Sequence, residues 1–337
     1  VTGVQTCALP ISSLISFFQF NITLSQLIIN PVFLSNSTAL HETLTFASQP
    51  ITSISFKLDL FFRHPCNIYV LFILCRYVKI GMGEFGEVLY GRIKESGQLV
   101  AIKALKRDKT DLFALLQEAL LLQIASSTGF AAHYRGLAPF CNSILGERFL
   151  EWAIICDFAG NPDGPVPYDF RHTLKAARNT HRTLQSVLEW IFTCTKIVYA
   201  IKQFHHMGML LNDIKADNIL LKPVNGGGYN PVFVDFGLAS IGEGITLALE
   251  VNDGNRAKIL KEYSHIAPEV LFGGETNAAS DVFSLGKALS LVAEAFPVEA
   301  LVNTISRCTL WNVSDRPTID ELINHLQWLS SNIIANK

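Results

Sequence analysis

The sequence contains few charged residues: only 17% of its 337 positions are Asp, Glu, Lys or Arg, against about a quarter in an average soluble domain. Glycine, proline and cysteine occur at ordinary levels (22, 13 and 7 residues), which excludes collagen-like chains and disulfide scaffolds. The net charge of −2 provides no basic field for nucleic acid or acidic lipid. The length suits one large domain or two smaller ones. The shortage of charge indicates a membrane protein or a chain of mixed composition.

Long hydrophobic runs are also missing. A membrane-spanning helix needs about 20 consecutive apolar residues, whereas the purest run, at 68–75, is far shorter and the stretch 11–33 is interrupted by Gln, Asn and Pro. No basic segment precedes that stretch, so a secretory signal is not expected. The seven cysteines include no CxxC pair and are expected to be reduced thiols. We therefore expect a cytoplasmic protein without a membrane span.

The scarcity of charge is concentrated at the start of the chain. Residues 1–76 contain only five of the 56 charged side chains, and 77–337 contain the other 51, about a fifth of that part. Residues 1–11 resemble the translation of a sequencing-library adapter, and the first methionine is Met82. We interpret residues 1–76 as a non-native or disordered segment. A transcript with a continuous coding frame through residues 1–90 would contradict this hypothesis.

Glycines at 81, 83 and 86 form the pattern G-x-G-x-x-G, with Val88 two residues further on. Glycine lets a backbone approach phosphates closely because it has no Cβ. The pattern alone is weak, since dinucleotide-binding folds use it ahead of a helix. Strand-like residues lie on both sides here, and a turn at 94–97 leads to another strand at 98–103, so a β-hairpin is predicted. On these residues alone, a purely structural hairpin is an equal alternative.

The next strand ends in Val100-Ala-Ile-Lys103, which resembles the strand lysine of the protein kinase family. The segment 111–122 is strongly helical, and its interior acid is Glu118. The resemblance implies that Lys103 grips the α- and β-phosphates of a nucleotide and pairs with Glu118. The alternative is that Glu118 is one solvated acid on an apolar helix.

Residues 210–221 resemble the kinase catalytic loop, H-R-D-x-x-x-x-N, with Asp213 and Asn218 at the family's spacing. The resemblance implies three roles. Asp213 would accept the proton of the substrate hydroxyl, Lys215 would stabilise the transferred phosphoryl group, and Asn218 would help to hold Mg²⁺. Phosphoryl transfer is mostly positioning and charge neutralisation, so a base, a cation and metal-holding groups are the parts that it requires.

Further motifs follow in the family's order. Asp235-Phe-Gly would provide a second metal ligand, Asp235, and Ala267-Pro-Glu269 closes a segment of 35 residues counted from it. The resemblance implies that Asp281 anchors the catalytic loop and that Arg316 pairs with Glu269. Seven such elements in order over about 240 residues identify the chain as similar to eukaryotic protein kinases.

The resemblance implies an α+β, bilobal fold. A small antiparallel sheet lobe with one helix would span 77–157, a hinge 158–165, and a larger, mainly helical lobe 166–337. Apolar spacing predicts helices near 183–207, 279–295 and 318–333. ATP and Mg²⁺ are the implied cofactors, and a protein with a Ser or Thr acceptor is the implied partner, with no nucleic acid. The implied nucleotide-binding residues are Gly81, Gly83, Gly86, Val88, Ala101, Lys103 and the backbone of Asp157 and Ala159, with Cys156 behind the adenine.

The chain departs from the family before its catalytic Asp, where Leu211-Asn212 replaces His-Arg. Asn212 removes the cation that would bind a phosphorylated activation loop. We therefore interpret the hydroxyls of that segment as ordinary loop residues, with phosphorylation as the alternative. Only residues 77–80 precede Gly81 outside the segment 1–76, so the first strand is expected to be incomplete. These departures also motivate a second hypothesis, a nucleotide-binding pseudokinase scaffold.

The motifs disagree on whether the side chain that accepts the phosphoryl group is Ser/Thr or Tyr. The loop G-E-F-G-E-V and the short gap from Lys103 to Glu118 are similar to tyrosine kinases, whereas Lys215 is similar to Ser/Thr enzymes. Because Lys215 would touch the reacting groups, it decides the prediction for Ser/Thr. A membrane receptor kinase is a third possibility that depends on residues 1–76 being genuine. The pair His205-His206 has no partners at ligand spacing and is interpreted as structural or exposed.

Overall fold

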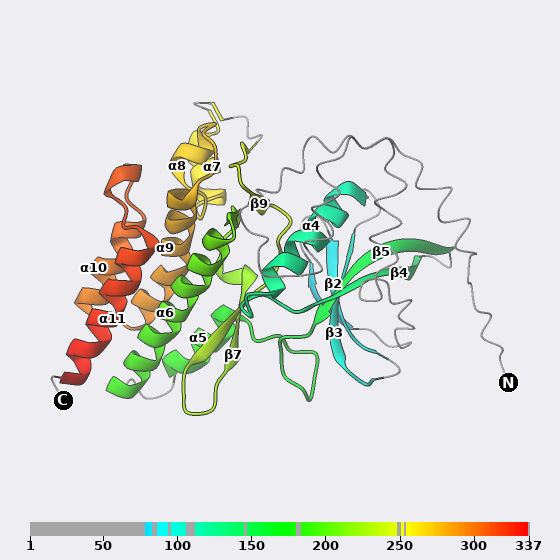
Figure 1. Cartoon of the computed structure of the whole chain (residues 1–337), viewed down its shortest axis with the longest axis horizontal. Helices are drawn as coiled ribbons and strands as arrows, with labels where there is room; N and C mark the ends of the chain where they lie inside the picture. Colours follow the sequence, from blue (N-terminus) through cyan, green and yellow to red (C-terminus); the bar gives the residue numbers. More distant parts are fainter. Residues whose placement is uncertain are drawn as a thin grey trace, which may run out of the picture. The chain divides into compact units, whose positions relative to one another are not determined.

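The computed structural model describes residues 78–82, 86–93, 96–105, 112–144, 147–179, 183–247, 251–252 and 254–335. The predictions about residues 1–76 and about Gly83 lie outside these residues. The described chain forms a strand-rich part first and a helix-rich part second (Figure 1).

Within the described residues, five strands form one antiparallel sheet in the order β1-β2-β3-β5-β4. The predicted hairpin is confirmed, because β1 and β2 pair on either side of the glycine pattern, with a register shift between Lys79 and Gly81. A single helix, α4, lies between β3 and β4 in the chain. The bounds are β1 Val78–Met82, β2 Gly86–Arg92, β3 Leu99–Leu105, α4 Leu112–Ser126, β4 Tyr134–Ile144 and β5 Glu147–Asp157.

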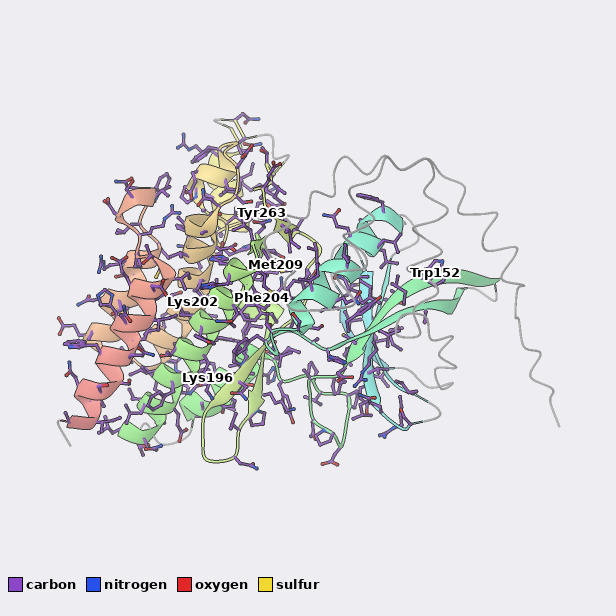
Figure 2. The ribbon with its side chains drawn as sticks, viewed as in Figure 1. Trp152, Lys196, Lys202, Phe204, Met209 and Tyr263 are labelled. Carbon is purple, nitrogen blue, oxygen red and sulfur yellow. The ribbon has the colours of Figure 1, made fainter. Side chains whose placement is uncertain are left out.

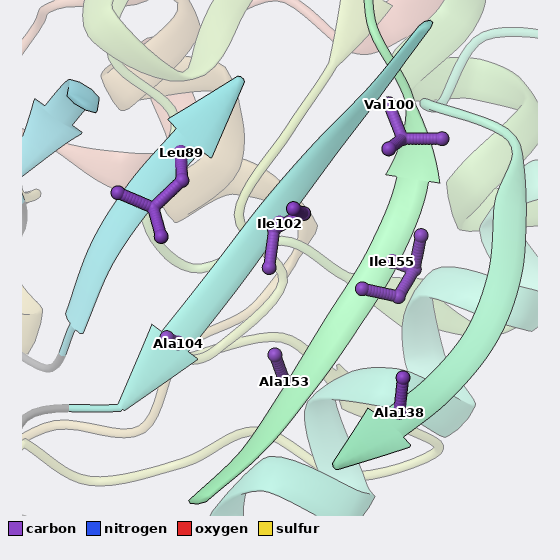
Figure 3. Close-up of a cluster of buried hydrophobic side chains, with 7 residues drawn as sticks. All are labelled: Leu89, Val100, Ile102, Ala104, Ala138, Ala153 and Ile155. Carbon is purple, nitrogen blue, oxygen red and sulfur yellow. The ribbon is translucent and has the colours of Figure 1, made fainter. Parts of the chain in front are cut away.

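The buried face of this sheet fixes the direction of the β3 side chains. Val100, Ile102 and Ala104 alternate along β3 and are all buried in one apolar cluster (Figure 3). Because successive side chains of a strand point to opposite faces, Ala101 and Lys103 point to the other face. The other members of the cluster are Leu89, Ala138, Ala153 and Ile155.

The second part of the chain is mainly helical, and the predicted helices are confirmed to within a few residues. Two of them begin at side-chain caps. Thr183 accepts a hydrogen bond from the Ser186 amide at 3.1 Å, and Asn277 forms a reciprocal capping box with Ser280. The helices are α5 Phe170–Asn179, α6 Leu184–His206, α7 Arg256–Glu262, α8 Pro268–Leu271, α9 Ala278–Ala295, α10 Glu299–Cys308 and α11 Ile319–Ala335.

Short strands and turns connect these helices and carry the motif residues. Strand β6 pairs with β9, and β7 pairs with β8. The 3₁₀ turn η4 lies within the segment 210–221 that resembles a catalytic loop. The bounds are β6 Met209–Leu210, η4 Ala216–Asn218, β7 Ile219–Pro223, β8 Tyr229–Phe233, β9 Ser240–Ile241 and η5 Val313–Asp315.

Helix α6 contributes many of the buried side chains of the helix-rich part. Its Phe204 is fully buried and meets Phe233 and Phe236 edge-to-face, with ring centroids 5.3 and 5.9 Å apart. Figure 2 labels Phe204 beside Met209, which is also fully buried. These aromatic contacts hold Phe236 in place, and with it the neighbouring Asp235.

The architecture confirms the predicted α+β class. In the part of the chain that the structure describes, no helix is both long and apolar enough to cross a membrane.

Candidate active site

Lys103 lies between two carboxylates from different elements. Its Nζ is 2.6 Å from Oε1 of Glu118 on α4 and 2.8 Å from Oδ1 of Asp235. Burial by itself would lower the pKa of Lys103, but the charges of Glu118 and Asp235 outweigh burial and raise that pKa above its usual value. The structure therefore holds a charged ammonium group in a fixed position, which suits the binding of phosphate oxygens.

The glycine-rich hairpin lies next to this ammonium group. Val88 of β2 is the register partner of Lys103 on β3, and Gly81 of β1 is the register partner of Val88. Gly86 begins β2 and is buried. The structure thus places Gly81, Gly86, Val88 and Lys103 on adjacent strands, and their role in nucleotide binding stays a prediction.

The carboxylate of Asp213 receives hydrogen bonds from three side chains. Lys215 Nζ lies 2.7 Å and Asn218 Nδ2 3.0 Å from Oδ2, and His265 Nε2 lies 3.0 Å from Oδ1. Burial by itself would raise the pKa of Asp213, but the hydrogen bonds from His265 and Lys215 outweigh it and hold that pKa below its usual value. Asp213 is therefore an ionised acceptor with a fixed orientation.

Asp281 holds the catalytic-type loop through main-chain groups. Its Oδ2 accepts from the Leu211 amide and its Oδ1 from the Asn212 amide, each at 2.9 Å. His205 Nε2 lies 2.9 Å from Oδ2 of the same carboxylate. Asp281 is fully buried. These bonds agree with the anchoring role that the resemblance implied for Asp281. Of the two histidines, His205 has a structural partner in Asp281, and His206 is exposed.

Replacing Asp281 by asparagine should destabilise the fold by about 1–3 kcal/mol, because an amide nitrogen would face a backbone N–H that needs an acceptor. The urea midpoint of the full chain measures this effect. Asp320→Asn is the matched control, since the Asp320 side chain is 68% exposed and pairs with Lys202 on the surface. Equal midpoints for the two variants would contradict the anchoring role.

Asn212 connects the loop to the beginning of the segment 235–269. Its Nδ2 donates to the Leu238 carbonyl at 2.8 Å and to Ser240 Oγ at 3.1 Å. Its backbone has a φ of 63°, in the left-handed region that asparagine tolerates better than most residues. Asn212 therefore makes neutral contacts to this segment at the position where the family has an arginine.

The residues predicted to hold metal, Asn218 and Asp235, both line one small cavity. Asp235, whose φ is 68°, presents Oδ1 to Lys103 and to the Gly237 amide at 2.8 and 3.3 Å. Asn218 donates its Nδ2 to Asp213, which leaves its amide oxygen as an acceptor. Carboxylate and amide oxygens suit Mg²⁺, which commonly takes few protein ligands and completes its shell with phosphates and water. The cavity is lined by Leu211, Asp213, Ile214, Asn218, Phe233, Val234, Asp235 and Phe236.

The end of β5 has a fixed geometry where the adenine contacts are predicted. The Asp157 amide donates to the His133 carbonyl at 2.9 Å, and the Ala159 carbonyl accepts from the Tyr168 amide at 3.1 Å. The Asp157 carboxylate accepts from Arg135 Nε at 2.6 Å and from Gln98 Nε2 at 2.8 Å. The amide and the carboxylate of Asp157 thus already have partners, so the predicted contacts of a base would involve other main-chain groups of Asp157 and Ala159.

Cys156 lies beside the other predicted adenine neighbour. It is the register partner of Ala101, and its Sγ is 3.8 Å from the Ala101 carbonyl oxygen. Burial raises the pKa of the Cys156 thiol to about 12. Cys156 is thus a partly buried, unreactive thiol, and its place behind an adenine stays a prediction.

The arrangement as a whole defines a class of protein. An antiparallel sheet with one helix carries a lysine clamped by two acids, and a helical part carries an aspartate whose neighbours are a lysine and an asparagine. These are the parts of a protein kinase domain.

Comparison with known proteins agrees with that class. Residues 168–303 match the family model for the protein kinase domain. The chain is 27% identical to a G-type lectin S-receptor-like serine/threonine-protein kinase of Arabidopsis thaliana over 73% of its length, and 31% identical to the serine/threonine-protein kinase PknK of Mycobacterium bovis over 64%. It is 28% identical to the serine/threonine-protein kinase PBL27 of Arabidopsis thaliana over 61%.

The chain spans only 27%, 17% and 36% of the lengths of these three relatives. The matched model and the kinase relatives show that the chain is similar to the eukaryotic-type protein kinase family over these parts of its length. The described α+β elements are consistent with the bilobal fold of that family.

Proposed function

We propose that this chain transfers the γ-phosphoryl group of ATP to serine or threonine hydroxyls of proteins, with Mg²⁺ as cofactor. The observation that carries the proposal is a pair of hydrogen-bonded clusters, one around Asp213 and one around Lys103. Lys215 and Asn218 bond to Asp213, and Glu118 and Asp235 bond to Lys103. Each charged group that phosphoryl transfer requires is present and already has a partner that fixes its position.

In this proposal each residue has one task. The acceptor oxygen attacks the γ-phosphorus, the bond from that phosphorus to the β-γ bridging oxygen breaks, and the hydroxyl proton passes to Asp213. Lys103 binds the α- and β-phosphates, and Lys215 lies beside Asp213, where the transferred group would carry negative charge. Asn218 and Asp235 would hold Mg²⁺, which neutralises phosphate charge when bound.

The preference for Ser/Thr is supported by Lys215 and by the names of the relatives, which are serine/threonine-protein kinases. Lys215 lies 2.7 Å from the predicted base, and this is why it has more weight than the tyrosine-kinase-like loop. Tyrosine phosphorylation is the alternative, and phosphoamino-acid analysis of the labelled product separates the two. The domain limits 77–157, 158–165 and 166–337 and the cytoplasmic location stay predictions.

The purified full chain should label dephosphorylated casein from radiolabelled ATP and Mg²⁺. Replacing Lys103 by methionine should lower the rate by about 10²-fold, because a fixed cation on the phosphates is lost. Lys196→Met is the matched control, since Lys196 of α6 bonds to Asn230 of β8 and to none of the site residues, and it should keep the wild-type rate. Equal labelling by the Lys103 and Lys196 variants would contradict the proposal.

The scaffold hypothesis predicts a different result from the same protein. If Leu211-Asn212 marks a pseudokinase, ATP and Mg²⁺ should raise the melting temperature of the chain without any transfer to casein. The geometry favours the enzyme, because neither Leu211 nor Asn212 supplies a catalytic group, and the backbone of both is held by Asp281.

A further inference from the structure

A histidine of the activation segment contacts the catalytic aspartate. His265 Nε2 lies 3.0 Å from Asp213 Oδ1, across 52 positions of sequence. The two side chains are 22% and 13% exposed. Neither the kinase motifs nor the chain's spacing predicted this contact, and none of the proposed tasks uses it.

The direction of the hydrogen bond follows from the chemistry of its acceptor. An ionised carboxylate can only accept hydrogen bonds, and the ammonium group of Lys215, 2.7 Å from Oδ2, favours the ionised form of Asp213. The His265 imidazole must therefore carry a hydrogen on Nε2 and donate it to Oδ1.

The backbone that carries His265 is held by an apolar cluster. Ile266 and Ala267, the next two residues, are buried with Phe283 of α9. The Ile266 amide also donates to the Tyr263 carbonyl at 2.9 Å. Because this backbone is fixed, the imidazole of His265 can define the orientation of Asp213.

The remaining acceptor capacity of Asp213 suggests what the contact does. A carboxylate offers about four lone-pair positions, and side-chain donors from His265, Lys215 and Asn218 use three of them. As far as the described residues show, one position on Oδ1 therefore stays available for an acceptor hydroxyl. The contact orients the base and leaves it accessible.

We propose that His265 is a positioning residue for phosphoryl transfer, which fixes the Asp213 carboxylate through Oδ1 and makes its orientation depend on the path of the activation segment. This inference rests on the proposed kinase activity. Asn212 holds the beginning of the same segment through Leu238 and Ser240. The segment is thus tied to the catalytic loop at both ends by side-chain hydrogen bonds that need no phosphate.

Variants at position 265 test this inference in the full chain. His265→Ala should lower kcat for casein about tenfold, with the KM for ATP unchanged within about twofold, because a misoriented base affects the chemical step. His265→Gln, whose amide N–H can reach as far as Nε2, should recover at least half of the loss. His172→Ala is the control, since the His172 side chain is 93% exposed, and it should match the wild type.

Hydrogen exchange provides a second readout that needs no catalysis. Amides of residues 256–267 should exchange about fivefold faster in His265→Ala and in Asp213→Ala, and at the wild-type rate in His265→Gln and His172→Ala. A wild-type chain without transfer would refute the proposed function, and exchange alone would then decide whether the contact fixes the segment.

Three results would overturn the inference. His265→Ala could be as active as the wild type or more active, which would mean that the imidazole covers the base. His265→Gln could lose as much activity as His265→Ala, which would mean that the N–H donor is not what matters. Exchange in residues 256–267 could be unchanged in His265→Ala, which would mean that the contact does not hold the segment.

Discussion

Replacing Asp213 by asparagine should lower the rate of transfer to protein by about 10³-fold, because the amide cannot accept the proton of the acceptor hydroxyl. The variant should still fold, since asparagine has nearly the same shape and its oxygen can accept from Lys215 or His265. It should also still bind ATP, because Lys103 obtains its partners from Glu118 and Asp235.

Single-turnover transfer to casein measures the chemical step of this variant, and a thermal shift with ATP and Mg²⁺ measures its binding. Asp217→Asn is the matched control, because Asp217 lies in the same loop but pairs on the surface with Arg171, with both side chains more than half exposed. Asp213→Asn should lose transfer and keep the thermal shift, whereas Asp217→Asn should keep both. Transfer by Asp213→Asn at the wild-type rate would remove Asp213 from the mechanism.

Replacing Arg316 by methionine should destabilise the fold by about 3–5 kcal/mol, the usual cost of leaving one member of a buried ion pair without its partner. The Arg316 side chain is fully buried and bonds to both oxygens of Glu269, at 2.6 and 2.7 Å. It also donates to the carbonyls of Leu310 and Ala279 at 2.7 and 3.0 Å. Methionine fills the space but satisfies none of these acceptors.

Urea unfolding of the full chain measures this loss. Arg316→Lys should recover part of the lost stability, because lysine keeps the charge but cannot form a bidentate pair with the carboxylate. Arg171→Met breaks an exposed pair and should cost at most about 1 kcal/mol. If Arg316→Met cost no more than Arg171→Met, the pair with Glu269 would not contribute to stability.

Much of the fold could be predicted because its signals are local. The helices at 184–206 and 278–295 follow from apolar residues three and four apart, and the hairpin follows from glycines between strand-like runs. The proximity of Lys103 and Glu118 could be predicted for a related reason. An acid on an apolar helix next to a lysine-bearing strand has few alternative partners, and the structure places the two 2.6 Å apart.

The contacts that were not predicted join residues far apart in the sequence, and they depend on the tertiary path of the chain. His265 reaches Asp213 only because the activation segment turns back over the catalytic loop, and no spacing in the sequence reports that path. The contacts of Asn212 could not be inferred either, since its replacement of arginine indicated a lost function and gave no sign of a new partner. The pairing of Arg135 with Asp157 depends on a strand register that the sequence does not specify.

The anchoring of the loop by Asp281 has a consequence for how this sequence can change over generations. Asp281 accepts from the amides of residues 211 and 212, and every amino acid except proline supplies such an amide. These two bonds therefore do not depend on which side chains occupy the two positions, whereas the positive φ of residue 212 still favours asparagine or glycine there. Leu-Asn can therefore stand where the kinase motif has His-Arg while both bonds from Asp281 to the backbone next to Asp213 are kept.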